Sequence, residues 1–212
     1  MKNQRTVLTV IGLLVTLGFA TIPISKFFDE FASVRNMIGY ELIWWTLVTL
    51  VLLFVRYLER RPLTSIGFRK PGIWNILIGI ASGLVILAGL VFIYYVVFPA
   101  LHVSEDQQMS QLVATPYWWR FITVVRAAVA EEIFFRGYAI ERLQELTGSV
   151  KFAGAFSCIV FAVEHVGFWN WSHILIAGFA GIILTVLYIW RRNLWVNMIA
   201  HFVVDGAAFL LG

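Results

Sequence analysis

Long apolar stretches, separated by short polar segments or by proline and glycine, run along most of this chain. They cover residues 6–25, 37–57, 73–98, 119–142, 150–168, 172–190 and 193–211. Each is close to the roughly 20 apolar residues that a helix needs to cross the hydrocarbon core of a bilayer. The pattern predicts an all-α, polytopic membrane helix bundle of about seven transmembrane helices.

We expect a single integral-membrane domain over residues 1–212. Residues from about 115 to 212 would form the core helices, and residues 1–72 would form peripheral anchoring helices and an interfacial loop. Gly79 and Gly83 lie four residues apart in the third stretch, a spacing that permits close contact between two helices.

The composition excludes an ordinary soluble domain. Of the 212 residues, 60% are hydrophobic and 13% are charged, and the mean hydropathy is +0.84. These residues supply too little polar surface to face water. The single cysteine, Cys158, excludes a disulfide framework or a cysteine-based zinc cluster. The net charge of +4 is typical of cytoplasmic loops in a membrane protein, so we expect no nucleic-acid partner.

Lysine and arginine are unevenly divided between the two sides of the predicted bundle. One side holds Lys26, Arg35 and Arg120, and the other holds Lys2, Arg5, Arg56, Arg60, Arg61, Arg69, Lys70, Arg142, Lys151, Arg191 and Arg192. Cytoplasmic loops carry the excess of positive charge, which places the N-terminus in the cytoplasm and the C-terminus outside. The compact loops favour a bacterial plasma membrane.

Ionisable residues lie inside the last four predicted spans, where each charge costs about 2.5–3.5 kcal/mol to insert. They are Arg126, Glu131, Glu132, Arg136, Glu164, His165, His201 and Asp205. Groups at this depth normally face the bundle interior and serve a function, although Arg126 and Glu164 could equally be structural pairing partners.

Helical spacing separates the roles of the two adjacent glutamates. Glu132 and Arg136 are four residues apart and share a helix face, so we expect a structural ion pair between them. Glu131 is turned away from Arg136 and stays free to act as a general base or acid.

Two further pairs have the same spacing: Phe161 with His165, and His201 with Asp205. Each pair would present one helix face to a common centre in a bundle. Together with Glu131, these polar groups could activate one water molecule. His102 and His173 are interpreted as ordinary loop and interface residues.

Three motifs occur in order: an EExxxR sequence at Glu131 to Arg136 followed by Gly137, an FxxxH sequence at Phe161 to His165, and a histidine motif from Asn197 to Asp205. With these motifs the chain resembles the CAAX-protease and bacteriocin-processing family, also called the Abi family of intramembrane endopeptidases. The loop from Arg60 to Phe68 looks like that family's interfacial segment.

The resemblance implies a buried proteolytic site in which Glu131 and His165 activate water, and His201 and Asp205 stabilise the oxyanion. In the eukaryotic members the last position is typically asparagine, whose amide can donate a hydrogen bond, whereas an ionised aspartate only accepts. We therefore expect Asp205 to orient His201, which would itself donate.

Glu131, His165 and His201 also meet the ligand requirements of a hydrolytic zinc site. We favour a metal-free mechanism with no cofactor, because the resemblance implies one and because Asp205 already gives His201 a partner. Zinc held by these three residues is the alternative.

The expected function is hydrolysis of a hydrophobic or lipid-anchored peptide, with membrane lipid as the other partner. The compact loops favour a peptide precursor over a prenylated substrate. One alternative is a non-catalytic bacteriocin-immunity or scaffold protein that binds a peptide. Another is a proton-coupled transporter, which the absence of sequence repeats and broken helices disfavours.

Overall fold

The computed structural model describes residues 2–22, 24, 31–103, 107–169 and 171–211, and all regular structure within these ranges is helical. The α-helices are α1 (Lys2–Thr21), α3 (Val34–Leu53), α4 (Ile73–Phe92), α5 (Phe98–Ala100), α6 (Gln107–Val113), α7 (Tyr117–Glu131), α8 (Glu141–Thr147), α9 (Val150–Phe168), α10 (His173–Arg191) and α11 (Leu194–Leu210). Three π-helical segments, η1 (Phe54–Leu58), η3 (Ile93–Val97) and η4 (Glu132–Ile140), and one 3₁₀ turn, η2 (Leu63–Ile66), complete the set.

The prediction of an all-α membrane bundle is confirmed. Among the described residues, four helices are long and apolar enough to cross a membrane: Gln4–Thr21, Val34–Leu58, Ile73–Ala100 and His173–Arg191. The remaining long helices, α7–η4–α8, α9 and α11, contain the candidate catalytic residues, and the total of seven crossings stays a prediction. The predicted end of the first span, at residues 23 and 25, and Lys26 lie outside the described residues.

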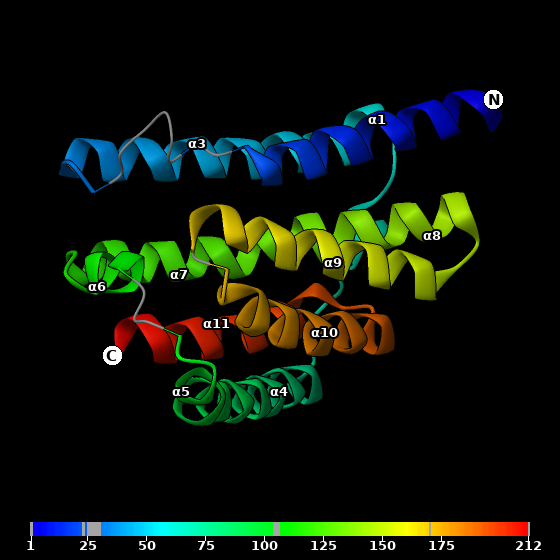
Figure 1. The fold of residues 1–212 in the computed structure, drawn as a ribbon. Coiled ribbons are helices and arrows are strands. Elements are labelled where there is room, and N and C mark those ends of the chain that lie inside the picture. Colours follow the sequence, from blue (N-terminus) through cyan, green and yellow to red (C-terminus); the bar gives the residue numbers. More distant parts are fainter. Residues whose placement is uncertain (1, 23, 25–30, 104–106, 170, 212) are drawn as a thin grey trace.

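The helices are arranged in layers (Figure 1). Helices α1 and α3 form one outer layer and α4 lies on the opposite side, with α7, α9, α10 and α11 between them. Contacts agree with this order, because α3 packs on α7, α1 packs on η4, and α11 packs on both α7 and α4. The helices that carry the three sequence motifs are therefore the inner helices of the bundle.

The close packing of α4 against α11 depends on Gly79 and Gly83. A Cβ atom at Gly79 would lie 2.8 Å from the carbonyl oxygen of Val196, and one at Gly83 would lie 2.7 Å from that of Ala200. Two helix backbones can approach this closely only where the side chain is absent. The close contact that the glycine spacing permits is present.

The loop between η1 and α4 folds inward against η4. Ile66 at the end of η2 has no exposed surface. Arg142 pairs with Glu59 at 2.6 Å and donates to the Ser65 hydroxyl at 3.0 Å, which anchors this loop. The loop is thus part of the packed bundle at the end where α8 and α9 meet.

Candidate active site

Two adjacent glutamates mark the point where α7 ends and the π-helical segment η4 begins. Glu131 is the last residue of α7, and Glu132 is the first residue of η4. Arg136 Nη1 donates to Glu132 Oε1 at 3.0 Å, and neither side chain has exposed surface. This is the ion pair that the four-residue spacing predicts, although the turn between the two residues is a π-helix, a rare form that is frequent at functional sites.

Glu132 also accepts hydrogen bonds from α11. Asn197 Nδ2 donates to Oε2 at 3.1 Å, and His201 Nδ1 lies 2.9 Å from Oε1. A buried carboxylate is costly unless it is paired and hydrogen-bonded, and Glu132 is both. Its two partners on α11 therefore fix this helix against η4.

Glu131 makes no ion pair with Arg136 and faces the two motif histidines instead. Its Oε2 atom lies 3.8 Å from His201 Nε2 and 4.0 Å from His165 Nε2. These separations are too long for direct hydrogen bonds. The oxygen is buried, and no described residue donates a hydrogen bond to it, so it can accept one from another molecule.

His165 has its tautomer fixed by its own helix. Its Nδ1 atom lies 2.7 Å from the carbonyl oxygen of Phe161. A carbonyl oxygen can only accept, so Nδ1 must carry the proton. In the neutral ring Nε2 then has a free lone pair, which points toward Glu131.

The aromatic ring of Phe161 holds the first and second motifs together. It lies under the guanidinium of Arg136, with 4.1 Å from Cζ to the ring centroid, and its centroid is 4.5 Å from that of His165. A cation over an aromatic face is stabilised by the ring quadrupole, more so when both are desolvated. Phe161 is itself buried. The phenylalanine thus supports the arginine with its ring and the histidine with its carbonyl.

His201 lies between carboxylates on both of its nitrogens. Glu132 contacts Nδ1, while Asp205 Oδ2 lies 3.3 Å from Nε2. The orienting contact to Nδ1 therefore comes from Glu132, whereas Asp205 lies on the side that faces Glu131. A ring protonated on both nitrogens has an acceptor for each N–H.

The four predicted catalytic residues are therefore close to one another: Glu131 from α7, His165 from α9, and His201 and Asp205 from α11. Arg126 lies outside this cluster. Its Nε atom donates to Glu41 Oε1 on α3 at 3.0 Å, with both side chains more than nine-tenths buried, which makes it a structural link between α7 and α3. Glu41 was not identified from the sequence.

Glu164 precedes His165 on α9, and its Oε1 atom is buried with no hydrogen-bond donor among the described residues. His173, which the sequence indicates to be an ordinary interface residue, is buried, and its ring is parallel to that of His165 at 6.5 Å between centroids. It also stacks on Trp169 at 4.5 Å. Its position could not be read from helical spacing, because it begins a different helix.

The alternative zinc site can be compared with these distances. Ligand atoms about 2.0–2.1 Å from a tetrahedral zinc ion are roughly 3.3 Å apart. Glu131 Oε2 is 3.8 and 4.0 Å from the two histidine nitrogens, and within the described residues no group of three His, Cys, Asp or Glu side chains is arranged to hold a metal ion. The three side chains are therefore more widely spaced than a zinc ion requires, and in this arrangement they do not fit one.

A carboxylate and two histidines inside a membrane helix bundle form an arrangement that suits a membrane-embedded hydrolase. Residues 113–207, which include all four candidate residues, match the family model of type II CAAX prenyl endopeptidases, Rce1-like. This match is to the CAAX-protease family that the motifs indicated. No curated protein and no solved structure matches the chain.

Proposed function

We propose that this protein is an intramembrane endopeptidase that hydrolyses a hydrophobic or lipid-anchored peptide, with water activated by Glu131 and His165 and without a metal ion. The observation that carries the proposal is the position of Glu131 Oε2 between Nε2 of His201 and Nε2 of His165, at 3.8 and 4.0 Å. Hydrolysis needs a base, an aligned water molecule and a donor for the oxyanion, and these three groups can supply them.

Separations near 4 Å suit one bridging water molecule, since hydrogen bonds to it are about 2.8 Å long. Glu131 and the unprotonated Nε2 of His165 both accept from this water, which directs its lone pair toward the substrate. The water oxygen attacks the carbonyl carbon of the peptide, and its proton moves to Glu131. When the C–N bond breaks, this proton passes to the leaving amine.

His201 is the proposed donor to the oxyanion that forms on the carbonyl oxygen. Its Nδ1 is directed to Glu132, which orients the ring and turns Nε2 toward the reacting atoms. A donor fixed in advance stabilises developing charge without reorganisation during the reaction.

Asp205 shares Nε2 of His201, at 3.3 Å. As an acceptor it favours a proton on that nitrogen, which is the form that donates. During the reaction the Nε2–H would be shared between Asp205 and the oxyanion. An asparagine in place of Asp205 would act differently, because its amide could donate to the oxyanion directly.

The substrate class rests on the location of the cluster. The inner helices hold it between outer apolar helices, so a peptide that reaches it must be compatible with the membrane interior (Figure 1). A hydrophobic or lipid-anchored peptide meets this condition. We favour a peptide precursor in a bacterial plasma membrane, with the N-terminus in the cytoplasm and the C-terminus outside.

The test is a comparison of membrane peptides, by mass spectrometry, from cells that carry the native chain or its Glu131→Gln variant. Glutamine keeps the size of the side chain and removes the base, and general bases contribute about 10²–10⁴-fold to rate. We expect an uncleaved precursor to accumulate in the variant, and the precursor identifies the substrate.

A matched control is Glu145→Gln, which makes the same substitution at an exposed glutamate on α8 outside the proposed machinery. This variant should cleave the precursor as the native chain does. A Glu131→Gln protein that is folded and still produces the cleaved peptide would refute the proposal. A cellular phenotype that persists in that variant without any cleaved peptide would instead favour an immunity or scaffold role.

A further inference from the structure

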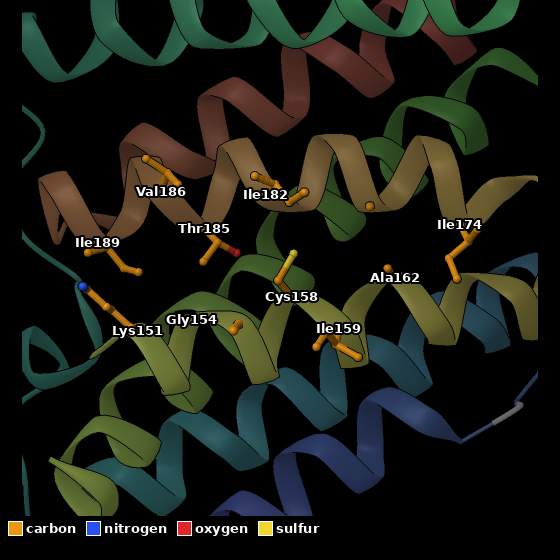
Figure 2. A pocket seen from close by; sticks show the side chains of 12 residues that line it. Lys151, Gly154, Cys158, Ile159, Ala162, Ile174, Ile182, Thr185, Val186 and Ile189 are labelled. Carbon is orange, nitrogen blue, oxygen red and sulfur yellow. The ribbon is translucent and has the colours of Figure 1, made fainter. Parts of the chain in front are cut away.

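A long groove runs between α9 and α10 on the outside of the bundle (Figure 2). Its volume is about 540 Å³, and none of the four candidate catalytic residues lines it. Ile159, Ile182 and Val186 line it and are 62%, 59% and 62% exposed, so the groove opens on the surface that faces the membrane. It is therefore a feature separate from the catalytic cluster.

Small residues form the floor of the groove. Gly154, Cys158 and Ala162 follow one another at four-residue intervals on α9, which places them on one face, and Gly178 lies opposite on α10. A Cβ at Gly178 would have only the Cβ of Ala162 near it, at 4.0 Å. There is room at this point for an additional hydrocarbon group between the two helices.

A hydroxyl group without a partner lies within this apolar groove. Thr185 is 6% exposed, and its Oγ1 atom is buried with no hydrogen-bond partner among the described residues. In Figure 2 the oxygen lies on the side toward Cys158. A buried hydroxyl that makes no hydrogen bond costs free energy. A molecule in the groove that offered an acceptor to this hydroxyl would remove that cost.

A positive charge lies at one end of the groove. Lys151 is exposed in the first turn of α9, and no ion pair between described residues involves it. Thr185 is level with Gly154, because a Cβ there would lie 3.1 Å from Thr185 Cγ2. Lys151 lies three residues before Gly154 on α9, so it is roughly 5 Å along the helix axis from Gly154 and Thr185. Among the residues that the structure describes, no aspartate or glutamate lines the groove.

We propose that the groove binds a phospholipid with an anionic headgroup. Its phosphate pairs with Lys151, an ester carbonyl about 5 Å deeper accepts from the Thr185 hydroxyl, and one acyl chain lies along Cys158, Ala162 and Gly178. The order of charge, single donor and apolar floor matches the order of groups in such a lipid. An extended peptide would present a repeated row of backbone groups, for which the lining offers one hydroxyl.

The sole cysteine of the chain, Cys158, makes the site measurable in the native protein. Its alkylation by a fluorescent maleimide is followed for the full chain in detergent micelles. Phosphatidylglycerol or phosphatidylcholine with identical acyl chains is then added. We expect phosphatidylglycerol to slow the reaction at least threefold more than phosphatidylcholine does, because the bound chain covers the thiol.

Three variants separate the parts of the site. Lys151→Gln should remove the difference between the two lipids, and Thr185→Val, which has the same shape without the hydroxyl, should weaken protection by both. Gly178→Leu should fill the groove, so that Cys158 is protected before lipid is added. Lys70→Gln, which removes an exposed charge that does not line the groove, is the control and should keep the preference.

Equal protection by the two lipids, no protection by either, or an unchanged preference in Lys151→Gln would overturn the proposal. Protection by a lipidated peptide at concentrations where phosphatidylglycerol has no effect would also overturn it, because the groove would then hold a substrate anchor. None of these measurements uses peptidase activity, so their outcome is independent of the proposed catalytic function.

Discussion

The Nδ1 atom of His201 lies 2.9 Å from Oε1 of Glu132, a carboxylate with no exposed surface. His165 contacts a carbonyl oxygen through its own Nδ1, at 2.7 Å. A carboxylate stabilises a ring that is protonated on both nitrogens, whereas a carbonyl suffices for a neutral ring. The two histidines around Glu131 therefore differ in what their Nε2 atoms can do: one donates and the other accepts.

Replacing Glu132 with alanine should destabilise the protein strongly. The change leaves the buried Arg136 without its counter-charge, which typically costs about 3–5 kcal/mol. Thermal unfolding in detergent should show a large drop in midpoint. Glu145→Ala is the control, since Glu145 pairs with Arg61 near the surface and such pairs contribute about 1 kcal/mol or less. Its second partner, Arg142, keeps the carboxylate of Glu59 at 2.6 Å in this variant. Similar losses in both variants would contradict the role of Glu132.

Replacing Asp205 with asparagine should preserve peptide cleavage. The amide of asparagine can donate to the oxyanion, and Glu132 still holds His201 at Nδ1. The measurement is the cleavage rate of the precursor identified with Glu131→Gln. A folded but inactive Asp205→Asn protein would show that the negative charge itself is required.

Removal of metal ions should leave activity intact. The purified protein is dialysed exhaustively against a strong zinc chelator, and cleavage is measured before and after. Full activity is expected because Glu131 serves as the base in the proposed reaction. A loss of activity that added zinc restores would assign Glu131, His165 and His201 as ligands instead.

Replacing Gly137 with alanine should lower stability by about 1–3 kcal/mol, the usual range for overpacking. The added Cβ would lie 2.7 Å from the backbone oxygen of Ile66 and 3.1 Å from the Leu194 side-chain atom Cδ1. Ile66 is fully buried, so its backbone has little room to shift. Gly18→Ala is a matched control, since nothing lies within 4 Å of a Cβ at that helical position. Equal unfolding midpoints for the two variants would contradict this explanation of the glycine after EExxxR.

Much of the fold follows from the sequence. The apolar spans predict the last three helices to within about two residues, and local signals fix the starts of α9 and α11. The Ser149 side chain caps α9 by accepting from the Phe152 N–H, and the Asn193 side chain caps α11 by accepting from that of Trp195. Pairs within one helix were predictable for the same reason: Glu132 with Arg136, and His201 with Asp205 at 3.3 Å.

Ion pairs and hydrogen bonds between side chains of different helices were not predictable from spacing. The pairing of Arg126 with Glu41, and that of His201 with Glu132, depend on how each helix is rotated against its neighbour. Spacing along one helix carries no information about that rotation. The π-helical form of η4 was also missed, because an extra residue in a turn is accommodated by packing and leaves no periodic pattern.

The buried ion cluster limits the path by which a peptide can enter. Separating α11 from η4 would strip Glu132 of its hydrogen bonds from Asn197 and His201, a costly change in the bundle interior. Glu131 and His165, in contrast, keep 21% and 22% of their side-chain surface exposed. In the proposed reaction, the scissile bond would therefore arrive from the exposed side of these two residues, while α11 stays packed against η4.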